Sequence, residues 1–177
     1  LASAFFNLCK MKNIKVGIIG GAGYTGGELL RILVNHPNVE ITFVHSNSNA
    51  GNPLFQVHTD LIGETDLLFT NELSQDIDVL FLCVGHGDAK KFLEANPFNE
   101  NIKIIDLSQD HRLASNANGF VYGLAEMNRE KIKQANYIAN PGCFATAIQL
   151  ALLPLATANQ LNNDIHINAI TGSTGAG

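Results

Sequence analysis

Apolar residues follow two recurring patterns along this chain, short β-branched runs and longer stretches with helical spacing. The short runs predict strands at residues 14–19, 39–45, 67–70, 76–84, 101–107 and 165–171. The longer stretches predict helices at residues 28–34, 89–95, 129–134 and 145–158. Because strands and helices alternate, the pattern predicts an α/β fold with a doubly wound, mostly parallel Rossmann-type sheet, followed by the beginning of a second α/β domain.

The first predicted strand leads directly into a glycine-rich turn. The turn fits two overlapping registers, Gly21-x-Gly23-x-x-Gly26 and Gly20-x-x-Gly23-x-x-Gly26. Glycine lets the backbone approach a pyrophosphate, and the helix that follows offers free N–H groups and a positive dipole end. Because the glycines lie between a strand and a helix, they predict a dinucleotide site, with a turn that serves only packing as the alternative.

A polar loop, Ser46-Asn47-Ser48-Asn49, follows the strand predicted at residues 39–45. Folds of this kind that prefer NAD place an Asp or Glu about 20 residues beyond the glycines, where it holds the ribose 2′-hydroxyl. This loop has no carboxylate, and the hydroxyls of Ser46 and Ser48 are suited to a 2′-phosphate. We therefore expect NADP as the cofactor, with a loop that contacts nothing as the alternative.

Gly85 and His86 follow the strand predicted at residues 76–84. In a doubly wound sheet the loops at the carboxyl ends of the strands face the ligand, so we expect this pair to lie near the cofactor. An ordinary exposed histidine is the simpler interpretation of His86.

The strand predicted at residues 101–107 leads into Ser108 and Arg112, two candidates for substrate binding. A guanidinium can hold a phosphate or a carboxylate through two hydrogen bonds. The alternative for Arg112 is an internal ion pair with Asp106 or Asp110.

Cys143 is the candidate nucleophile. It follows Asn140-Pro141-Gly142 at the start of the helix predicted at residues 145–158, and a helix N-terminus stabilises a thiolate. A thiolate beside a nicotinamide cofactor indicates covalent acyl chemistry, in which an acyl phosphate loses phosphate and the resulting thioester is reduced to an aldehyde. A buried, unreactive cysteine is the alternative.

Composition and charge narrow the classes of function. Hydrophobic residues make up 46% of the 177 residues, which suits a packed core and argues against disorder. The net charge is −5 and there is no basic run, so nucleic acid is not expected as the main partner. Residues 1–10 are apolar but lack the cationic start of a signal peptide and are too short to span a bilayer, so no membrane partner is expected. The 3 cysteines lack metal-ligand spacing, which predicts no metal site and a reducing, cytoplasmic setting.

The two ends of the chain differ from its middle. Residues 1–10 are apolar and precede Met11, a natural start point, so we interpret them as an upstream extension or a remnant of cloning. The chain stops on a glycine-rich loop directly after a predicted strand, which favours the front half of a longer protein. The predicted organisation is an NADP-binding domain at residues 11–143 and the start of a catalytic and dimerisation domain at residues 144–177.

Several motifs occur together and in a fixed order. They are Gly20-Gly-Ala-Gly-Tyr-Thr-Gly26, Asp106-Leu-Ser-x-Asp-x-Arg112, Tyr122-Gly-Leu-x-Glu126, Asn140-Pro-Gly-Cys143 and Gly172-Ser-x-Gly-Ala-Gly177. In this combination the chain from Met11 to Gly177 resembles the N-acetyl-gamma-glutamyl-phosphate reductases, arginine-pathway relatives of the aspartate-semialdehyde dehydrogenases.

The resemblance implies a cytoplasmic enzyme, a homo-oligomer when full length, that uses NADPH to reduce an N-acyl-glutamyl phosphate to the semialdehyde. By motif it implies Cys143 as the nucleophile, Arg112 as a residue that binds the substrate or its phosphate, and Ser173 and Gly175 in a loop near the nicotinamide and the substrate. It also implies cofactor binding by Gly20, Gly23, Tyr24, Thr25 and Gly26. To these we add, from their positions in the sequence, Gly21, Ser46, Ser48, Gly85 and His86 as cofactor residues and Ser108 and Asn140 as substrate residues.

Three departures from the family pattern qualify these expectations. Ala125 stands where members often have Pro, and Asn47 and Asn49 stand in a loop where many have an arginine that would favour NADP. None of the 6 histidines lies in the family's catalytic histidine motif, which we expect beyond Gly177. Because a general base contributes about 10²–10⁴-fold, residues 1–177 alone are expected to bind cofactor weakly and turn over little substrate.

Three other interpretations remain open. An aspartate-semialdehyde dehydrogenase would share the cysteine chemistry, and a non-catalytic nucleotide-binding module would keep the fold with an inert cysteine. The third interpretation is a chain that does not fold alone, because the helix at residues 145–158 would expose an apolar face.

Overall fold

The computed structural model describes residues 13–162 and 164–175. The chain forms two compact units, a first unit of Leu1–Cys83 with Phe98–Ile102 and a second unit of Val84–Pro97 with Lys103–Gly177. The extension predicted at residues 1–10 lies outside the described residues.

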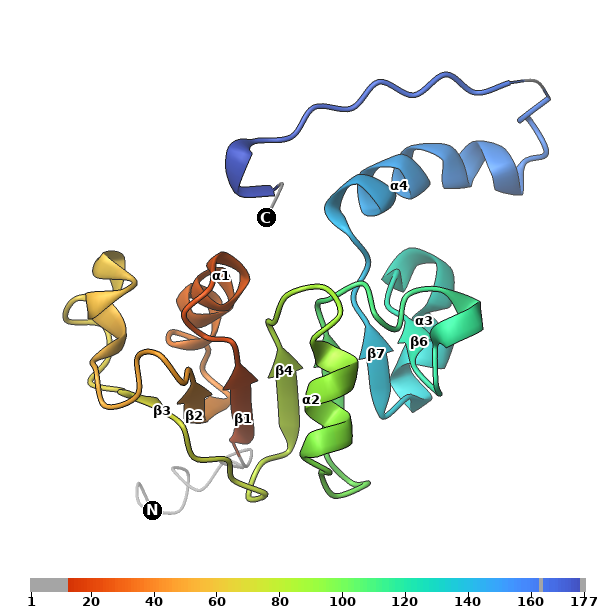
Figure 1. Cartoon of the computed structure of the whole chain (residues 1–177). Coiled ribbons are helices and arrows are strands. Elements are labelled where there is room, and N and C mark those ends of the chain that lie inside the picture. The colour runs from red at the N-terminus through yellow and green to blue at the C-terminus, as the bar shows by residue number, and fades with distance from the viewer. Residues whose placement is uncertain (1–12, 163, 176–177) are drawn as a thin grey trace, which may run out of the picture. The chain divides into compact units, whose positions relative to one another are not determined.

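The first unit is a parallel sheet that is built around its first strand (Figure 1). β1 (Ile14–Ile19) pairs with β2 (Val39–His45) on one side and with β4 (Val79–Leu82) on the other, and β2 pairs with β3 (Phe69–Thr70). The connections carry α1 (Tyr24–Leu33) and two short 3₁₀ helices, η1 (Leu54–Gln56) and η2 (Thr59–Leu61). β1 ends in four buried residues, as an apolar central strand of a parallel sheet should.

The second unit has its own parallel strands, in the order β5, β7, β6. β5 (Lys103–Asp106) pairs with β7 (Tyr137–Ala139), which pairs with β6 (Val121–Tyr122). The helices of this unit are, in chain order, α2 (Ala89–Ala95), the 3₁₀ helix η3 (Ala114–Asn116), α3 (Ala125–Gln134), α4 (Cys143–Thr157) and the 3₁₀ helix η4 (Ser173–Gly175).

The structure confirms the predicted α/β class, since every strand pairing described within the two units is parallel. The predicted bounds of β1, β2 and α2 match the structure. Three helices start earlier than predicted: α1 begins at Tyr24 instead of residue 28, α3 at Ala125 instead of residue 129, and α4 at Cys143 instead of residue 145. The glycines at the start of α1 mask its beginning in a hydrophobicity pattern, because glycine has no side chain to show a buried face.

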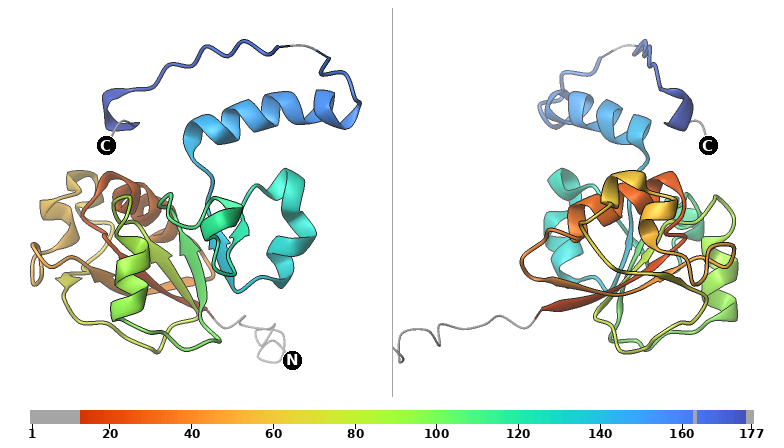
Figure 2. Two further views of the ribbon diagram at one scale, coloured as in Figure 1. Left: turned by 45° about the vertical axis from the view of Figure 1, so that its right-hand side comes forward. Right: turned by 90° about the vertical axis from the view of Figure 1, so that its left-hand side faces the viewer.

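Two predictions near the end of the chain are wrong. Residues 165–171 form no strand, and within the described residues no neighbouring strand is present to accept their backbone hydrogen bonds. Figure 2 shows these residues as an extended segment that follows the continuous ribbon of α4. The other error concerns α4 itself, because the spacing of the apolar residues at 145–158 predicts a broad buried face. No described residue of α4 is buried, and the Leu150 and Leu155 side chains are 40% and 47% exposed.

Candidate active site

The glycine turn connects β1 to α1 in the first unit. Gly20 has a φ of 76°, a left-handed conformation that glycine adopts without strain. The N–H groups of Gly20 and Gly21 both donate to the His45 carbonyl at 3.1 Å, and the Gly23 N–H donates to the Gly20 carbonyl at 3.1 Å. Partial burial lowers the pKa of the His45 imidazole, and a hydrogen bond with Asn47 acts in the opposite direction. The turn is therefore tied to the end of β2 and closed before α1 begins.

Close packing requires glycine at one position of the turn and leaves space at another. A Cβ on Gly26 would lie 2.7 Å from the Gly20 oxygen and from the Gly21 Cα, so α1 could not approach the turn. A Cβ on Gly23 would meet nothing nearer than 3.5 Å, and this glycine is exposed. The first turn of α1 thus presents its N–H groups on an open side, as a pyrophosphate requires. Two exposed residues follow there, Tyr24 and Thr25.

The two serines of the loop after β2 lie in different environments. Ser46 is buried, and its Oγ accepts a hydrogen bond from the Asn49 amide at 3.2 Å. Ser48 is exposed, and its Oγ accepts from the same amide at 3.1 Å. Ser48 therefore offers its hydroxyl at the surface, whereas the Ser46 hydroxyl is held inside the loop.

Gly85 and His86 begin the connection to α2 in the second unit, and both are exposed. The His86 Nδ1 accepts a hydrogen bond from the Gln109 N–H at 3.2 Å. This contact joins the loop before α2 to the loop after β5.

Asp110 strengthens the same connection. Its carboxylate accepts hydrogen bonds from the backbone N–H groups of Gly87 at 2.6 Å and Lys90 at 3.2 Å, at the start of α2. Partial burial acts to raise the pKa of Asp110, but the N–H groups of Gly87, Lys90 and Ala89 outweigh it and hold the pKa below its ordinary range. Asp110 thus caps α2 from a distant part of the chain.

A buried carboxylate organises the loop that carries Arg112. Asp106, fully buried at the end of β5, accepts hydrogen bonds from the Ser108 N–H at 2.8 Å and the Ser108 Oγ at 3.0 Å. It also accepts one from the Nδ1 of buried His111 at 2.7 Å, and we assign the proton to that nitrogen because a carboxylate only accepts. The His111 ring stacks on Phe120 with centroids 4.0 Å apart. The Ser108 hydroxyl, which was predicted to bind the substrate, donates its hydrogen to Asp106 within this network.

Arg112 binds backbone carbonyls. Its Nε donates to the Asn140 oxygen and its Nη2 to the Leu107 oxygen, both at 2.8 Å. No ion pair with Asp106 or Asp110 occurs in the described part of the chain, because those carboxylates bind the groups named above. The guanidinium therefore links the loop after β5 to the segment that precedes Cys143.

Cys143 is exposed and is the first residue of α4. The Thr146 N–H and Oγ1 both donate to the Gly142 carbonyl, at 2.8 and 2.9 Å, so the turn that carries the cysteine is closed by its own helix. The Asn140 N–H donates to the Asp106 carbonyl at 2.8 Å and fixes the other side of the turn. The sulfur is thus held at the surface at a helix N-terminus, where a thiolate is stabilised.

Two open hollows flank the start of α4 within the second unit. Cys143 and Asn140 line one of about 600 Å³, and Arg112 lines the other, of about 490 Å³, with Gly142. The structure therefore brings Asn140 beside Cys143, and it places Arg112 on the other side of the turn.

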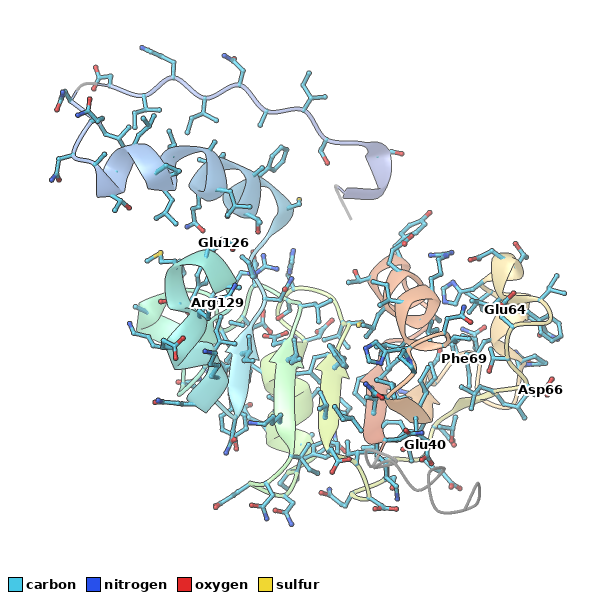
Figure 3. All side chains as sticks on the ribbon, turned by 180° about the vertical axis from the view of Figure 1, so that it is seen from behind. Glu40, Glu64, Asp66, Phe69, Glu126 and Arg129 are labelled. Carbon is cyan, nitrogen blue, oxygen red and sulfur yellow. The ribbon has the colours of Figure 1, made fainter. Side chains whose placement is uncertain are left out.

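The sequence did not single out Glu126, although this residue also lines the hollow of Cys143. Figure 3 shows Glu126 at the end of α3 that lies nearest α4. In the sequence, Glu126 stands out only as the last residue of the Tyr122-Gly-Leu-x-Glu126 motif. No hydrophobic period and no spacing to another polar residue assigns it a function. Ser173 and Gly175 form η4, where both are exposed.

No group of three or more His, Cys, Asp or Glu side chains among the described residues is placed to hold a metal ion. No helix in the described part of the chain is long and apolar enough to cross a membrane.

Known proteins with similar sequences share one activity name. A relative from Azobacteroides pseudotrichonymphae, an N-acetyl-gamma-glutamyl-phosphate reductase, is 65% identical over 93% of this chain and 52% of its own length. A relative of the same name from Parabacteroides distasonis is 62% identical over 93% of this chain and 51% of its own. The chain thus spans about half the length of the curated relatives that it matches.

Solved structures support the fold. The aspartate semialdehyde dehydrogenase II of Vibrio cholerae, in complex with ASA, matches 83% of this chain and 47% of its own with a TM-score of 0.63 at 20% identity. The Candida albicans aspartate semialdehyde dehydrogenase with NADP matches 84% of this chain and 48% of its own, with a TM-score of 0.63 at 18% identity. Both likenesses concern the fold alone.

Two family models match the chain one after the other. Residues 143–177 match the dimerisation domain of semialdehyde dehydrogenases. Residues 15–135, which contain the glycine turn, match their NAD-binding domain, and the chain therefore belongs to the semialdehyde dehydrogenase family.

Proposed function

We propose that the full-length protein is an NADP-dependent acyl-phosphate reductase, which converts N-acetyl-gamma-glutamyl phosphate to the corresponding semialdehyde with release of phosphate, in arginine biosynthesis. The observation that carries the proposal is the exposed Cys143 at the first residue of α4, lining a hollow with Asn140. Family membership and the names of the relatives support the choice of reaction.

In the proposed reaction the Cys143 thiolate attacks the carbonyl carbon of the acyl phosphate. The bond from that carbon to the phosphate oxygen breaks, phosphate leaves, and a thioester forms on Cys143. When bound, the nicotinamide cofactor supplies the hydride that reduces this thioester. The carbon–sulfur bond then breaks, which releases the semialdehyde and restores the thiolate.

The residues around Cys143 have supporting roles in this proposal. Asn140, which lines the same hollow, is suited to hydrogen-bond the substrate. Arg112 holds the backbone of Asn140 in place through its Nε, and we propose that its remaining donors attract the anionic substrate. Ser108 is proposed to act indirectly, because its hydroxyl is held by Asp106.

The glycine turn is the proposed site of the cofactor pyrophosphate. Gly20, Gly23 and Gly26 give a closed turn with an open side at the start of α1, which fits a dinucleotide phosphate. Exposed Ser48 is the proposed neighbour of a 2′-phosphate, and the absence of a carboxylate from residues 46–49 favours NADP over NAD. A titration with NADPH and NADH should show tighter binding of NADPH.

The test is Cys143→Ser in the full-length protein. With N-acetyl-gamma-glutamyl phosphate and NADPH, the variant should lose at least about 10³-fold in kcat, since oxygen replaces the attacking sulfur. Iodoacetamide should label the parental protein at Cys143 and the substrate should protect it, while the buried Cys83 serves as an internal control. An undiminished rate of semialdehyde formation by the variant would refute covalent reduction.

Two other functions give different results in the same assays. An aspartate-semialdehyde dehydrogenase, the activity of the structural neighbours, would prefer aspartyl phosphate as the substrate. A non-catalytic nucleotide-binding module would bind NADPH with no protection of Cys143 by either acyl phosphate.

The setting and assembly are part of the proposal. Cys143 is a free, exposed thiol, which suits a reducing, cytoplasmic compartment. The match of residues 143–177 to a dimerisation domain supports a homo-oligomer of the full-length protein.

A further inference from the structure

A histidine from a distant segment contacts the glycine turn in the first unit. His58 is buried, with only 7% of its surface exposed, and its Nε2 lies 2.7 Å from the Gly21 carbonyl oxygen. A carbonyl oxygen only accepts, so we assign a proton to Nε2, which donates to Gly21. The reaction described above makes no use of this buried polar side chain.

The segment that carries His58 is anchored on both sides of the imidazole. Leu54 and Leu61 are buried, with 0% and 3% of their surface exposed. Asp60 accepts hydrogen bonds from Arg31 of α1 through both of its carboxylate oxygens, one of them at 2.9 Å. Phe69, labelled in Figure 3, has its ring 6.3 Å from the His58 ring. The imidazole is therefore held in one position relative to α1.

The place of the imidazole explains a glycine inside α1. A Cβ on Gly27 would lie 2.6 Å from Cε1 and 2.7 Å from Nδ1 of His58. Glycine in a helix interior is destabilising relative to alanine, so a glycine here needs a structural reason. The reason is that the His58 ring packs directly against the α1 backbone at this point, which brings Nε2 within reach of the turn.

The hydrogen bond to Gly21 sets the direction of one peptide plane. No peptide bond among residues 13–162 and 164–175 is cis, and in a trans peptide the C=O and the following N–H point in opposite directions. With the Gly21 C=O directed to buried His58, the Ala22 N–H is directed away from it. Within the described residues this N–H has no hydrogen-bond acceptor. An N–H so placed is available to an anion.

We propose that His58 is a positioning residue of the nucleotide site, which fixes the Gly21–Ala22 peptide so that the Ala22 N–H is preorganised for the cofactor pyrophosphate. This rests on the proposed NADPH-binding function. The role is distinct from that of the glycines, which give the turn its shape, because His58 determines which way one of its peptides faces.

The experiment compares two substitutions at residue 58 in the full-length protein, with the Kd for NADPH as the readout. His58→Ala leaves the Gly21 carbonyl without its donor, and the Kd should rise about tenfold. His58→Gln places an amide N–H near the position of Nε2 and should stay within about threefold of the parental Kd. If His58→Ala binds NADPH as tightly as the parent, or if His58→Gln is as weak as His58→Ala, the proposal is wrong.

Two controls separate positioning from loss of folding. Leu54→Ala removes a buried neighbour on the same segment without touching the turn, so it should lower the Tm and leave the Kd within about twofold. Gly27→Ala should weaken NADPH binding by displacing the ring, and its effect should shrink when combined with His58→Ala, because the clash is then gone. Independent effects of these two substitutions would contradict the steric coupling.

The result also distinguishes this proposal from the proposed function. If the parental protein binds no NADPH, the proposed function fails. In that case amide hydrogen exchange at Gly21 and Ala22, compared between the parent and His58→Ala, still measures whether His58 orders the turn. Equal exchange in the two proteins would overturn the positioning role.

Discussion

The buried carboxylate of Asp106 gives the most specific prediction for the second unit. Its two oxygens accept three hydrogen bonds, from the Ser108 N–H, the Ser108 Oγ and the His111 Nδ1, in a place from which solvent is excluded. We expect Asp106→Ala to leave all three donors without an acceptor and to open a small cavity. Asp106→Asn keeps the volume and one acceptor oxygen.

The magnitude follows from these contacts. A buried polar group that loses its partner costs about 1–3 kcal/mol, and Asp106→Ala leaves three such groups. Asp106→Ala should therefore lower the free energy of unfolding by about 3–5 kcal/mol, and Asp106→Asn by about 2 kcal/mol. The loop with Arg112 and the turn before Cys143 should lose order together, because the Asp106 carbonyl also accepts the Asn140 N–H.

The assay is hydrogen–deuterium exchange read by mass spectrometry, combined with denaturant unfolding. Peptides that cover residues 103–112 and 137–143 should exchange about 30-fold faster in Asp106→Asn, the factor that corresponds to about 2 kcal/mol. Asp66→Asn is the matched control, since Asp66 is exposed, and it should change stability by less than about 0.5 kcal/mol. If Asp106→Asn and Asp66→Asn gave the same stability and exchange, the carboxylate would not organise this loop.

Two further predictions concern the glycine turn and the start of α2. Gly26→Ala should raise the Kd for NADPH at least tenfold, because its Cβ would lie 2.7 Å from backbone atoms of the turn. The Kd is measured by calorimetric titration, and a value equal to the parental one would contradict this close packing. Asp110 has a pKa below its ordinary 3.8, so its stabilising effect is fully present above that pH and is lost as the pH falls through the lower folded value. Thermal unfolding at a series of pH values tests this. At pH 7 Asp110→Asn should be less stable than the parent by up to about 1 kcal/mol, and the difference should disappear at the lowest pH. A difference in stability that stays constant with pH would be inconsistent with the carboxylate as its source.

Local patterns in the sequence were enough to predict several elements and the principal candidates. β1 ends in four buried residues and β2 is an alternating, β-branched segment, and the predicted bounds of both match the structure because each pattern is typical of a strand. The glycine turn and the position of Cys143 at a helix start are also local features, since each depends on residues adjacent in the chain. For the same reason the prediction of an exposed, helix-terminal sulfur needed no knowledge of distant contacts.

Tertiary structure decided what depends on residues far apart in the sequence. The 2 residues of β6 and the 3 of β7 are too few for a periodic pattern and exist because β7 has a partner on each side. Residues 165–171 have an equally β-like composition, yet they form no strand without a neighbour to complete their hydrogen bonds.

The same distinction applies to the side chains of the site. Arg112 donates to the carbonyl of a residue 28 positions away, and His58 reaches a carbonyl 37 positions away, so no local pattern could indicate either partner. The sequence by itself determined the bounds of β1, β2 and α2 and where the glycines and the cysteine lie. Only the folded chain determined which polar groups are satisfied internally and which remain available to a ligand, because a hydrogen bond depends on positions in space.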